Sequence, residues 1–263
     1  MVAALRRGWG ICAPLRPSAG FTRRSLHLKT VAMNLPRLHL LAAVSALLLP
    51  FSAVAADADF KPIFNGKDLT GWDGDPRFWS VRDGVLRGET TVKALPIGNT
   101  FLIWQEGKLK DFELRVKFRI QNGNSGIQYR AKDLGKWVVS GYQAEVENKQ
   151  GKVGFLYEEK GRGYLANVGE MVMIGVDGKP QVTGSVGEKS DLIAKGYYKE
   201  KDWNEYFIIA RGNYIEHWLN GFKTVSVIDN DEKNRALEGI LALQIHSGPP
   251  MLVEFKDILL KQL

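Results

Sequence analysis

Carboxylates and an amide alternate along the segment from Tyr142 to Glu147, and these residues have the plainest chemical potential in the chain. Successive side chains of an extended strand point to opposite faces, so Gln143, Glu145 and Glu147 would share one face. The Cα atoms of Glu145 and Glu147 would lie roughly 6.6 Å apart, which is compatible with the carboxyl pairs that hydrolyse glycosides. We therefore expect Glu145 to line a site, with Glu147 either as its partner or as an ordinary solvated residue.

The chain has two histidines after residue 56, His217 and His246. Gln244 and His246 alternate with apolar residues, so a strand there would place both on one polar face. An imidazole on such a face can act as a general base or a metal ligand, or it can be a hydrogen-bonded structural group. We expect His246 rather than His217 to contribute to a site, and a divalent metal near His246 and Glu145 stays open.

Gln128 and Arg130 follow the same alternation in the segment 125–130. An arginine on a ligand-binding face can hold a sugar oxygen or an enolate through charge-assisted hydrogen bonds. The alternative is a surface ion pair with one of the nearby glutamates. We expect Arg130 to be catalytic and Gln128 to bind substrate.

Trp104, Tyr157 and Arg162 are further candidates for substrate binding. Aromatic rings stack on the apolar faces of sugars, although many aromatic residues simply belong to the core. The charged segment 158–163 predicts a rim beside a site. The sequence contains no phosphate-binding glycine loop, no zinc-binding histidine pair on a helix and no serine nucleophile elbow.

Short strands with glycine-rich turns must position these residues. The segment 112–120 alternates apolar and charged residues throughout, which predicts a strand with one buried face. Asp83-Gly84 and Asn220-Gly221 predict tight hairpins, and further strands are expected at 142–148 and 154–157. The region 167–202 interrupts this rhythm and predicts a long rim or lid with a short helix at 188–195. Many short strands of this kind predict an all-β sandwich or jelly roll in one domain.

The net charge of +7 belongs entirely to the first 56 residues. Seven of the 36 basic residues and none of the 29 acidic residues lie there, so the rest of the chain carries 29 of each. A neutral body offers no electrostatic footprint for nucleic acid. The single cysteine, Cys12, also lies in this leader, so residues 57–263 have neither disulfides nor thiolate chemistry.

The leader has two parts. Residues 33–56 have the layout of a secretory signal, with Arg37 before an apolar run and Ala53-Val54-Ala55 as a cleavage pattern. The apolar run is too short for a lasting membrane span, so we expect an exported, periplasmic or extracellular protein. Residues 1–32 are rich in arginine, and they are either an extension before the true start at Met33 or a transit peptide. The folded domain is expected at 57–263.

Several motifs resemble the 3-keto-disaccharide hydrolase domain family. They include FNGKDLTGW (64–72), WSVRDGVLRG (79–88), DFELRVKFR (111–119), NSGIQYR (124–130), SGYQAEVEN (140–148), HWLNG (217–221) and LQIHSGPP (243–250). The resemblance implies a concanavalin A-like jelly roll of two antiparallel sheets with a concave, ligand-facing side. It further implies an exported bacterial protein, and some members are similar to lyases that split 3-keto-glycosides and hydrate the resulting glycal.

One motif departs from the family. Many members carry Gly-Tyr-Glu-x-Gln where this chain has Gly141-Tyr142-Gln143-Ala144-Glu145. The carboxylate and the amide have exchanged places. A catalytic acid therefore cannot be transferred to Gln143, and Glu145 becomes the candidate carboxylate.

Three functions remain open at this point. The first is cleavage of a 3-oxidised glycoside, in which Glu145 or His246 removes the proton beside the ketone while Arg130 or a metal stabilises the enolate. The second is a glycan-binding module that uses Trp104, Tyr157 and the glutamines. The third is ordinary glycoside hydrolysis through Glu145 and Glu147, and in each case the ligand is a carbohydrate.

Overall fold

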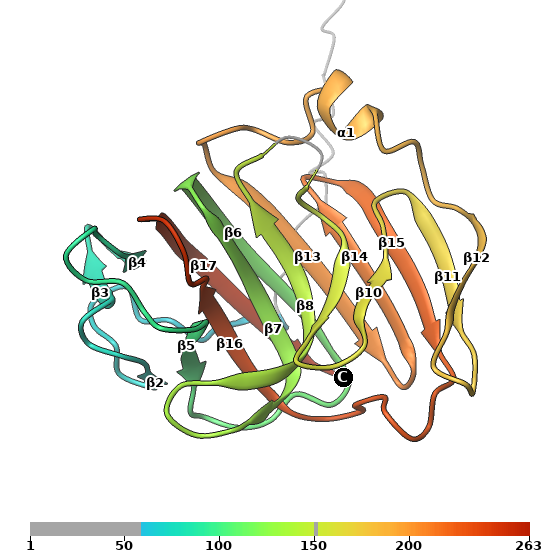
Figure 1. Cartoon of the computed structure of the whole chain (residues 1–263), viewed down its shortest axis with the longest axis horizontal. Coiled ribbons are helices and arrows are strands. Elements are labelled where there is room, and N and C mark those ends of the chain that lie inside the picture. Colours follow the sequence, from blue (N-terminus) through green and yellow to red (C-terminus); the bar gives the residue numbers. More distant parts are fainter. Residues whose placement is uncertain (1–58, 150–151) are drawn as a thin grey trace, which may run out of the picture. The chain divides into compact units, whose positions relative to one another are not determined.

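The structure is a computed structural model that describes residues 59–149 and 152–263. In that part of the chain two β-sheets pack face to face (Figure 1). One sheet has ten strands, with β1 (Lys61–Pro62) paired to β17 beside the ordered path β12 (Pro180–Ser185), β11 (Glu170–Ile174), β15 (Phe222–Asp229), β14 (Tyr214–Leu219), β13 (Asn204–Arg211), β6 (Phe112–Asn122), β17 (Leu252–Gln262), β4 (Val85–Glu89) and β3 (Trp79–Arg82).

The second sheet has seven strands. Their order is β10 (Gly163–Ala166), β9 (Leu156–Glu159), β8 (Val139–Glu147), β7 (Asn124–Asp133), β16 (Ile240–Ile245), β5 (Thr100–Trp104) and β2 (Trp72–Asp73). Neighbouring strands are antiparallel in both sheets except that β11 runs parallel to β15. The predicted all-β, two-sheet sandwich of jelly-roll type is confirmed.

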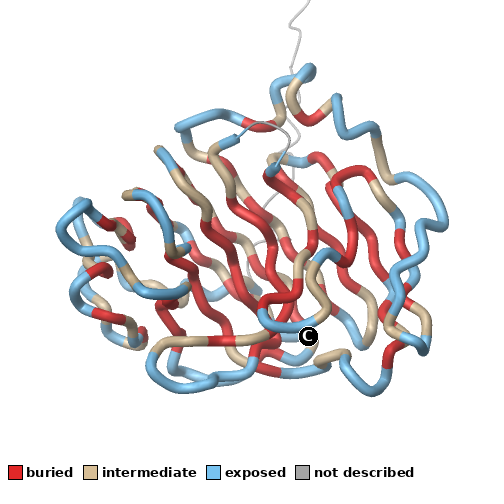
Figure 2. Tube along the Cα trace, viewed as in Figure 1, coloured by how far each residue is buried: buried red, intermediate tan, exposed pale blue. Residues whose placement is uncertain are grey.

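The core lies between the sheets, and β6 shows how the sequence forms it. Buried and half-buried residues alternate strictly from Phe112 to Gln121, because only one face of this strand meets the other sheet. Phe118 stacks on Tyr206 with ring centroids 5.4 Å apart. Figure 2 shows buried residues through the middle of both sheets and exposed residues in most of the turns.

Both predicted hairpins form. Asn220 and Gly221 have φ values of 48° and 82°, and Asp83 and Gly84 have 49° and 77°. Two successive residues with positive φ match the right-handed twist of the flanking strands. The turns therefore join β14 to β15 and β3 to β4 without splaying them.

The region 167–202 differs from the expected lid. It contains the two strands β11 and β12, which extend the ten-stranded sheet, followed by the short helix α1 (Asp191–Ala194). Val172 and Ile174 are buried in the core. The strand β11 therefore packs as part of the sheet and does not cover a ligand site. None of its residues lines the hollows described below, and the lid interpretation is wrong.

The predictions for residues 1–32 and 33–56 fall outside the described residues. Within 59–149 and 152–263, no helix combines the length and the apolar character needed to cross a membrane.

Candidate active site on the seven-stranded sheet

A hollow of about 310 Å³ opens on the outer face of the seven-stranded sheet. We call it the amide–carboxylate hollow, and it is lined by Asn99, Asn124, Gln143, Glu145, Phe155, Tyr157, Glu159, Tyr164, Gln244 and His246. Tyr142, Ala144 and Val146 of β8 point into the core between the sheets, so the alternate residues of β8 face outward. Five predicted site residues thus meet here, namely Gln143, Glu145, Tyr157, Gln244 and His246.

Glu145 ends a chain of buried amides. The Gln244 side chain donates to Gln143 Oε1 at 3.0 Å, and Gln143 Nε2 donates to Glu145 Oε2 at 2.5 Å. Asn124 donates to the other oxygen of Glu145 and, at 3.3 Å, to Glu147. The carboxyl group of Glu145 is therefore fixed in orientation although water barely reaches it.

The pKa of Glu145 is raised to about 8. Burial is the main cause, because it disfavours the charged form. The hydrogen bonds from Asn124 and Gln143 oppose the shift, while the negative charges of Glu147 and Glu159 add to it. Near neutral pH this residue is thus mostly a carboxylic acid with a proton to give.

Gly126 makes room for this arrangement. It lies opposite Glu145 in the β7–β8 pair, and a Cβ atom at its position would come within 2.4 Å of the Gln143 side chain. Any larger residue would push the Gln143 amide aside. The glycine is therefore a packing requirement of the site.

His246 stands at the exposed edge of the hollow, directly after β16. Its Nδ1 lies 2.5 Å from the Ser247 carbonyl oxygen. A carbonyl only accepts hydrogen bonds, so Nδ1 must bear the proton. In the neutral ring Nε2 then has a free lone pair, which is what a general base needs.

An aromatic wall closes one side of the hollow. The ring centroid of Tyr164 lies 5.0 Å from that of Phe155 and 5.3 Å from that of Tyr157. Tyr157 is half-buried and Tyr164 is 64% exposed. Flat, accessible rings of this kind can stack on a sugar.

Sequence reasoning missed Glu159 and Asn99. Asn99 Nδ2 donates to Glu159 Oε1 at 3.1 Å, and Asn99 Oδ1 accepts from the Ser247 backbone nitrogen at 3.0 Å. Asn99 therefore ties β9 to the segment that bears His246. The alternation that placed Tyr157 also places Glu159 two residues on, but the charged segment had suggested a rim loop.

The expectation that Arg130 shares this face is wrong. The β7–β8 register shifts between Tyr129 and Lys132, and Arg130 has a φ of 46°, so the alternation breaks at this bulge. The side chain is buried and its guanidinium donates to the carbonyls of Lys110 and Gly212 and to Asp111. Arg130 fastens loops together and does not line the hollow.

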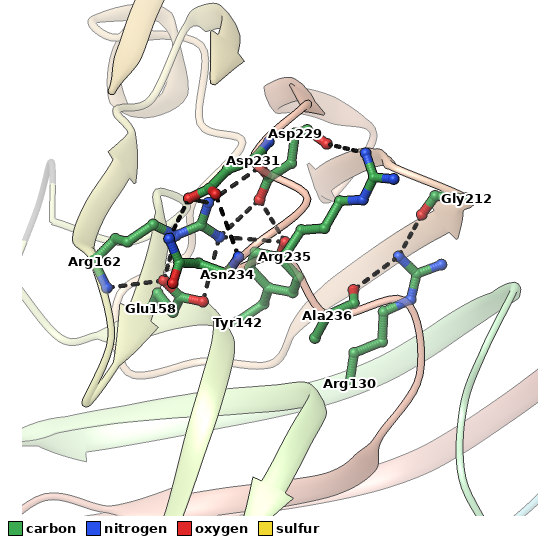
Figure 3. A network of polar contacts seen from close by, with 10 residues as sticks. All are labelled: Arg130, Tyr142, Glu158, Arg162, Gly212, Asp229, Asp231, Asn234, Arg235 and Ala236. Carbon is green, nitrogen blue, oxygen red and sulfur yellow. Dashed lines mark hydrogen bonds and ion pairs between the residues drawn. The ribbon is translucent and has the colours of Figure 1, made fainter. Parts of the chain in front are cut away.

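Arg162 is also placed elsewhere. It forms ion pairs with Glu158 at 2.6 Å, Asp229 at 2.7 Å and Asp231 at 3.2 Å, and Figure 3 shows this cluster with the Tyr142 hydroxyl beside it. Burial lowers the pKa of Arg162, but the bonds to Asp229 and Glu158 outweigh that effect and the net shift is upward. The expected role in substrate binding does not fit this position.

The other candidates fall into three positions. Trp104 belongs to the core between the sheets and is not on the ligand face as expected. Gln128 is fully buried against Gln143, below the hollow. Glu147 is half-buried and meets Glu145 through Asn124, but it does not line the hollow.

His217 is a core histidine. Its Nε2 lies 2.7 Å from the Tyr129 hydroxyl, and burial lowers its pKa to about 3. The ring is therefore neutral at ordinary pH and has no access to a ligand.

A divalent metal does not fit the donor set that is present. No group of three or more His, Cys, Asp or Glu side chains in the described residues could hold a metal ion. Both Glu145 oxygens already accept amide hydrogens.

The chain matches one family model and is similar in fold to solved structures. The family model described as the 3-keto-alpha-glucoside-1,2-lyase-like domain matches residues 59–261. Two crystal structures of candidate glycosyl hydrolases from Parabacteroides distasonis ATCC 8503 are similar in fold. One has a TM-score of 0.51 and 21% identity, covering 78% of this chain and 99% of its own. The other has a TM-score of 0.50 and 20% identity, covering 78% and 94%. No curated protein matches the chain.

Proposed function

The chain belongs to the family of 3-keto-alpha-glucoside-1,2-lyase-like domains, and from this we propose that it cleaves 3-keto-glycosides by elimination and hydration in the amide–carboxylate hollow. Membership of this family indicates a protein that acts on glycosides. The observation that carries the finer proposal is the pairing of a buried, protonated Glu145 with an exposed imidazole in one hollow. An acid and a base held in different environments are what such a reaction requires.

His246 takes the proton in this proposal. A ketone at C3 acidifies the hydrogen on C2, because the resulting charge moves onto the carbonyl oxygen. Nε2 of His246 removes that hydrogen and the C2–H electrons form the enolate. The orientation of the ring, with Nδ1 bonded to the Ser247 carbonyl, leaves Nε2 available for this step.

Glu145 gives a proton to the departing group. The enolate re-forms the ketone, a C1–C2 double bond appears and the C1–O bond breaks. The leaving oxygen takes the proton of Glu145, which the raised pKa keeps in place near pH 7. A poor leaving group can therefore depart as a neutral alcohol.

Hydration completes the cycle. Water adds to the double bond, with its hydroxyl going to C1 and a proton to C2. Glu145, now a carboxylate, takes the proton from water, and protonated His246 returns its proton to C2. Both groups regain their starting states, and the net reaction is hydrolysis.

The developing enolate oxygen needs a hydrogen-bond donor. Neither lysine nor arginine is present among the described residues that line the hollow. The phenolic hydroxyl of Tyr157 is the donor that we assign to this task, because Tyr157 lies in the wall of the hollow. The amide of Gln143 already donates to Glu145, and the amide of Gln244 already donates to Gln143.

Three variants test the proposal, with Glu147→Gln as the control matched to Glu145→Gln. Purified protein is incubated with a 3-keto-glucoside, and aglycone release is measured for wild type, Glu145→Gln, His246→Ala and Glu147→Gln. We expect the first two substitutions to lower kcat by about 10²- to 10⁴-fold and Glu147→Gln to have a much smaller effect. Circular dichroism checks that each variant is folded.

The other functions predict different results. Cleavage of unoxidised glycosides, lost equally in Glu145→Gln and Glu147→Gln, would identify an ordinary glycosidase. Binding of glycans in a calorimeter without any turnover would identify a binding module. Release from the 3-keto-glucoside that persists in the Glu145→Gln, His246→Ala double variant would refute the mechanism.

A further inference from the structure

A second, larger hollow adjoins the first. Its volume is about 760 Å³, and both hollows are lined by Asn99. Asn99, Phe101 and Ile103 are each two residues apart, so their side chains point to the same face of the sheet. Phe101 and Ile103 form a cluster with Ala242 that is separate from the main core between the sheets. The two hollows therefore border one another at Asn99 on the outer face of the seven-stranded sheet.

The two hollows differ in chemistry. Amides and carboxyl groups dominate the first, whereas the exposed lining of the second is mostly carbon. We call the second one the apolar hollow, and its carbon surface comes from Phe78, Pro96, Ile97, Ile103, Trp137 and Val138.

Five charged residues lie at its edge, namely Asp73, Asp75, Arg77, Asp133 and Lys136, and three of them are held by the following contacts. Asp75 is paired with Arg77 at 2.5 Å, and Asp133 Oδ1 accepts from the Gly135 backbone nitrogen at 2.7 Å. Ile97, by contrast, is 107% exposed. An isoleucine so fully in water adds nothing to folding through burial, but it offers surface to an apolar ligand.

A strained turn holds Trp137 in the wall of the apolar hollow. Gly135, Lys136 and Trp137 have φ values of 82°, 54° and 56° in succession, and this conformation is unfavourable for the two residues that have a Cβ atom. The Trp137 carbonyl accepts a hydrogen bond of 2.9 Å from the Phe101 backbone nitrogen, which anchors the turn on β5. Strain of this kind is typical of functional positions.

We propose that the apolar hollow is the leaving-group subsite, and that the preferred substrate is a 3-keto-glycoside with an apolar, aromatic alcohol as its aglycone rather than a second sugar. This inference rests on the proposed function and deepens it. The keto-sugar lies against the amides and the aromatic wall, its C1 oxygen faces Asn99, and the aglycone lies against Ile97 and Trp137. The carbon surface of this hollow gives a second sugar no hydrogen bonds, whereas an aromatic ring leaves water against it.

Two substrates with leaving alcohols of similar acidity test the inference. The ratio of kcat/KM for 2-phenylethyl and ethyl 3-keto-glucosides is measured for wild type, Trp137→Ala, Ile97→Asn and Leu134→Ala. We expect a ratio of about ten or more in wild type, because the phenyl ring leaves water only in the larger substrate. Trp137→Ala and Ile97→Asn should bring the ratio towards one, whereas Leu134→Ala, in the same turn but outside the hollow, should preserve it. Ile97 is fully exposed, so its variant tests the inference even if Trp137→Ala unfolds.

Binding measurements separate the two possible failures. If neither substrate is cleaved, the proposed function fails, and calorimetry with 2-phenylethyl and ethyl glucosides still tests the subsite. Tighter binding of the phenyl compound that depends on Ile97 supports it. Equal kcat/KM values or equal binding in wild type, or a preference for a disaccharide that depends on Trp137, would overturn the inference.

Discussion

Glu145 is a carboxyl group that the fold keeps out of water, and this has a measurable thermodynamic effect. Its folded-state pKa of about 8 lies above the ordinary value of 4.5. The folded protein therefore holds a proton that the unfolded chain releases, and the stability linked to this residue is full below pH 4.5 and is lost as the pH rises towards 8. The burial that raises the pKa of Glu145 thus weakens the fold at alkaline pH.

Replacing Glu145 with glutamine should remove this dependence. We expect the free energy of unfolding of wild type, measured against that of Glu145→Gln, to fall between about pH 5 and pH 8 by at most about 1.4 kcal/mol per pH unit. Urea titrations of both proteins across that range provide the measurement. Parallel pH curves for the two proteins would show that Glu145 titrates normally.

Sequence alternation placed some residues correctly and others not, for physical reasons. It brought Gln143 and Glu145 to the outer face of the seven-stranded sheet because β8 is regular through both. It failed for Arg130, because a β-bulge with a left-handed residue reverses which face the following side chains occupy. No residue pattern in this segment indicates the bulge.

Burial and sequence distance explain the errors for Trp104 and Arg162. Every residue of β5 is buried, so no apolar–polar contrast showed which face Trp104 would occupy. Arg162 depends on carboxylates 67 and 69 residues further along the chain, a distance that no local pattern spans.

At the scale of elements, hairpin signals were reliable and the long irregular region was not. The Asn220-Gly221 and Asp83-Gly84 turns predicted their strands because positive φ is a local preference. The edge hairpin β11–β12 was hidden because β12 is exposed along its whole length. A strand without a buried face lacks the alternation by which strands are recognised.

The β14–β15 turn offers a clean test of local backbone preference. A Cβ atom at Gly221 would meet no neighbour within 4 Å, so Gly221→Ala changes only the cost of a φ of 82°. We expect it to destabilise the protein by about 1 kcal/mol, seen as a lower midpoint in thermal unfolding. Gly98→Ala is the control, because that position is equally open and has no such φ. Equal midpoints for the two variants would contradict a cost that arises from the positive φ at Gly221.

At the scale of the whole molecule, the sequence predicts a body without net charge behind a basic leader. Expression of the full chain in a bacterium should yield a processed protein that begins near residue 57, because 33–56 has the layout of a secretory signal. N-terminal sequencing of the periplasmic or secreted fraction measures this. A Val44→Arg substitution, which interrupts the apolar run at 40–49, should leave the protein unprocessed. Recovery of an intact leader on the wild-type protein would argue against export.

The ion cluster around Arg162 has a consequence for any attempt to rebuild this protein. Glu158 lies in β9 of the sheet that bears the hollow, whereas Asp229 ends β15 of the opposite sheet. The guanidinium of Arg162 thus connects the β9–β10 hairpin, which carries Tyr157 and Tyr164, to the opposite sheet. Grafting only the seven-stranded sheet onto a new scaffold would leave Asp229 behind, and the β9–β10 hairpin would lose its ion-pair connection to the opposite sheet.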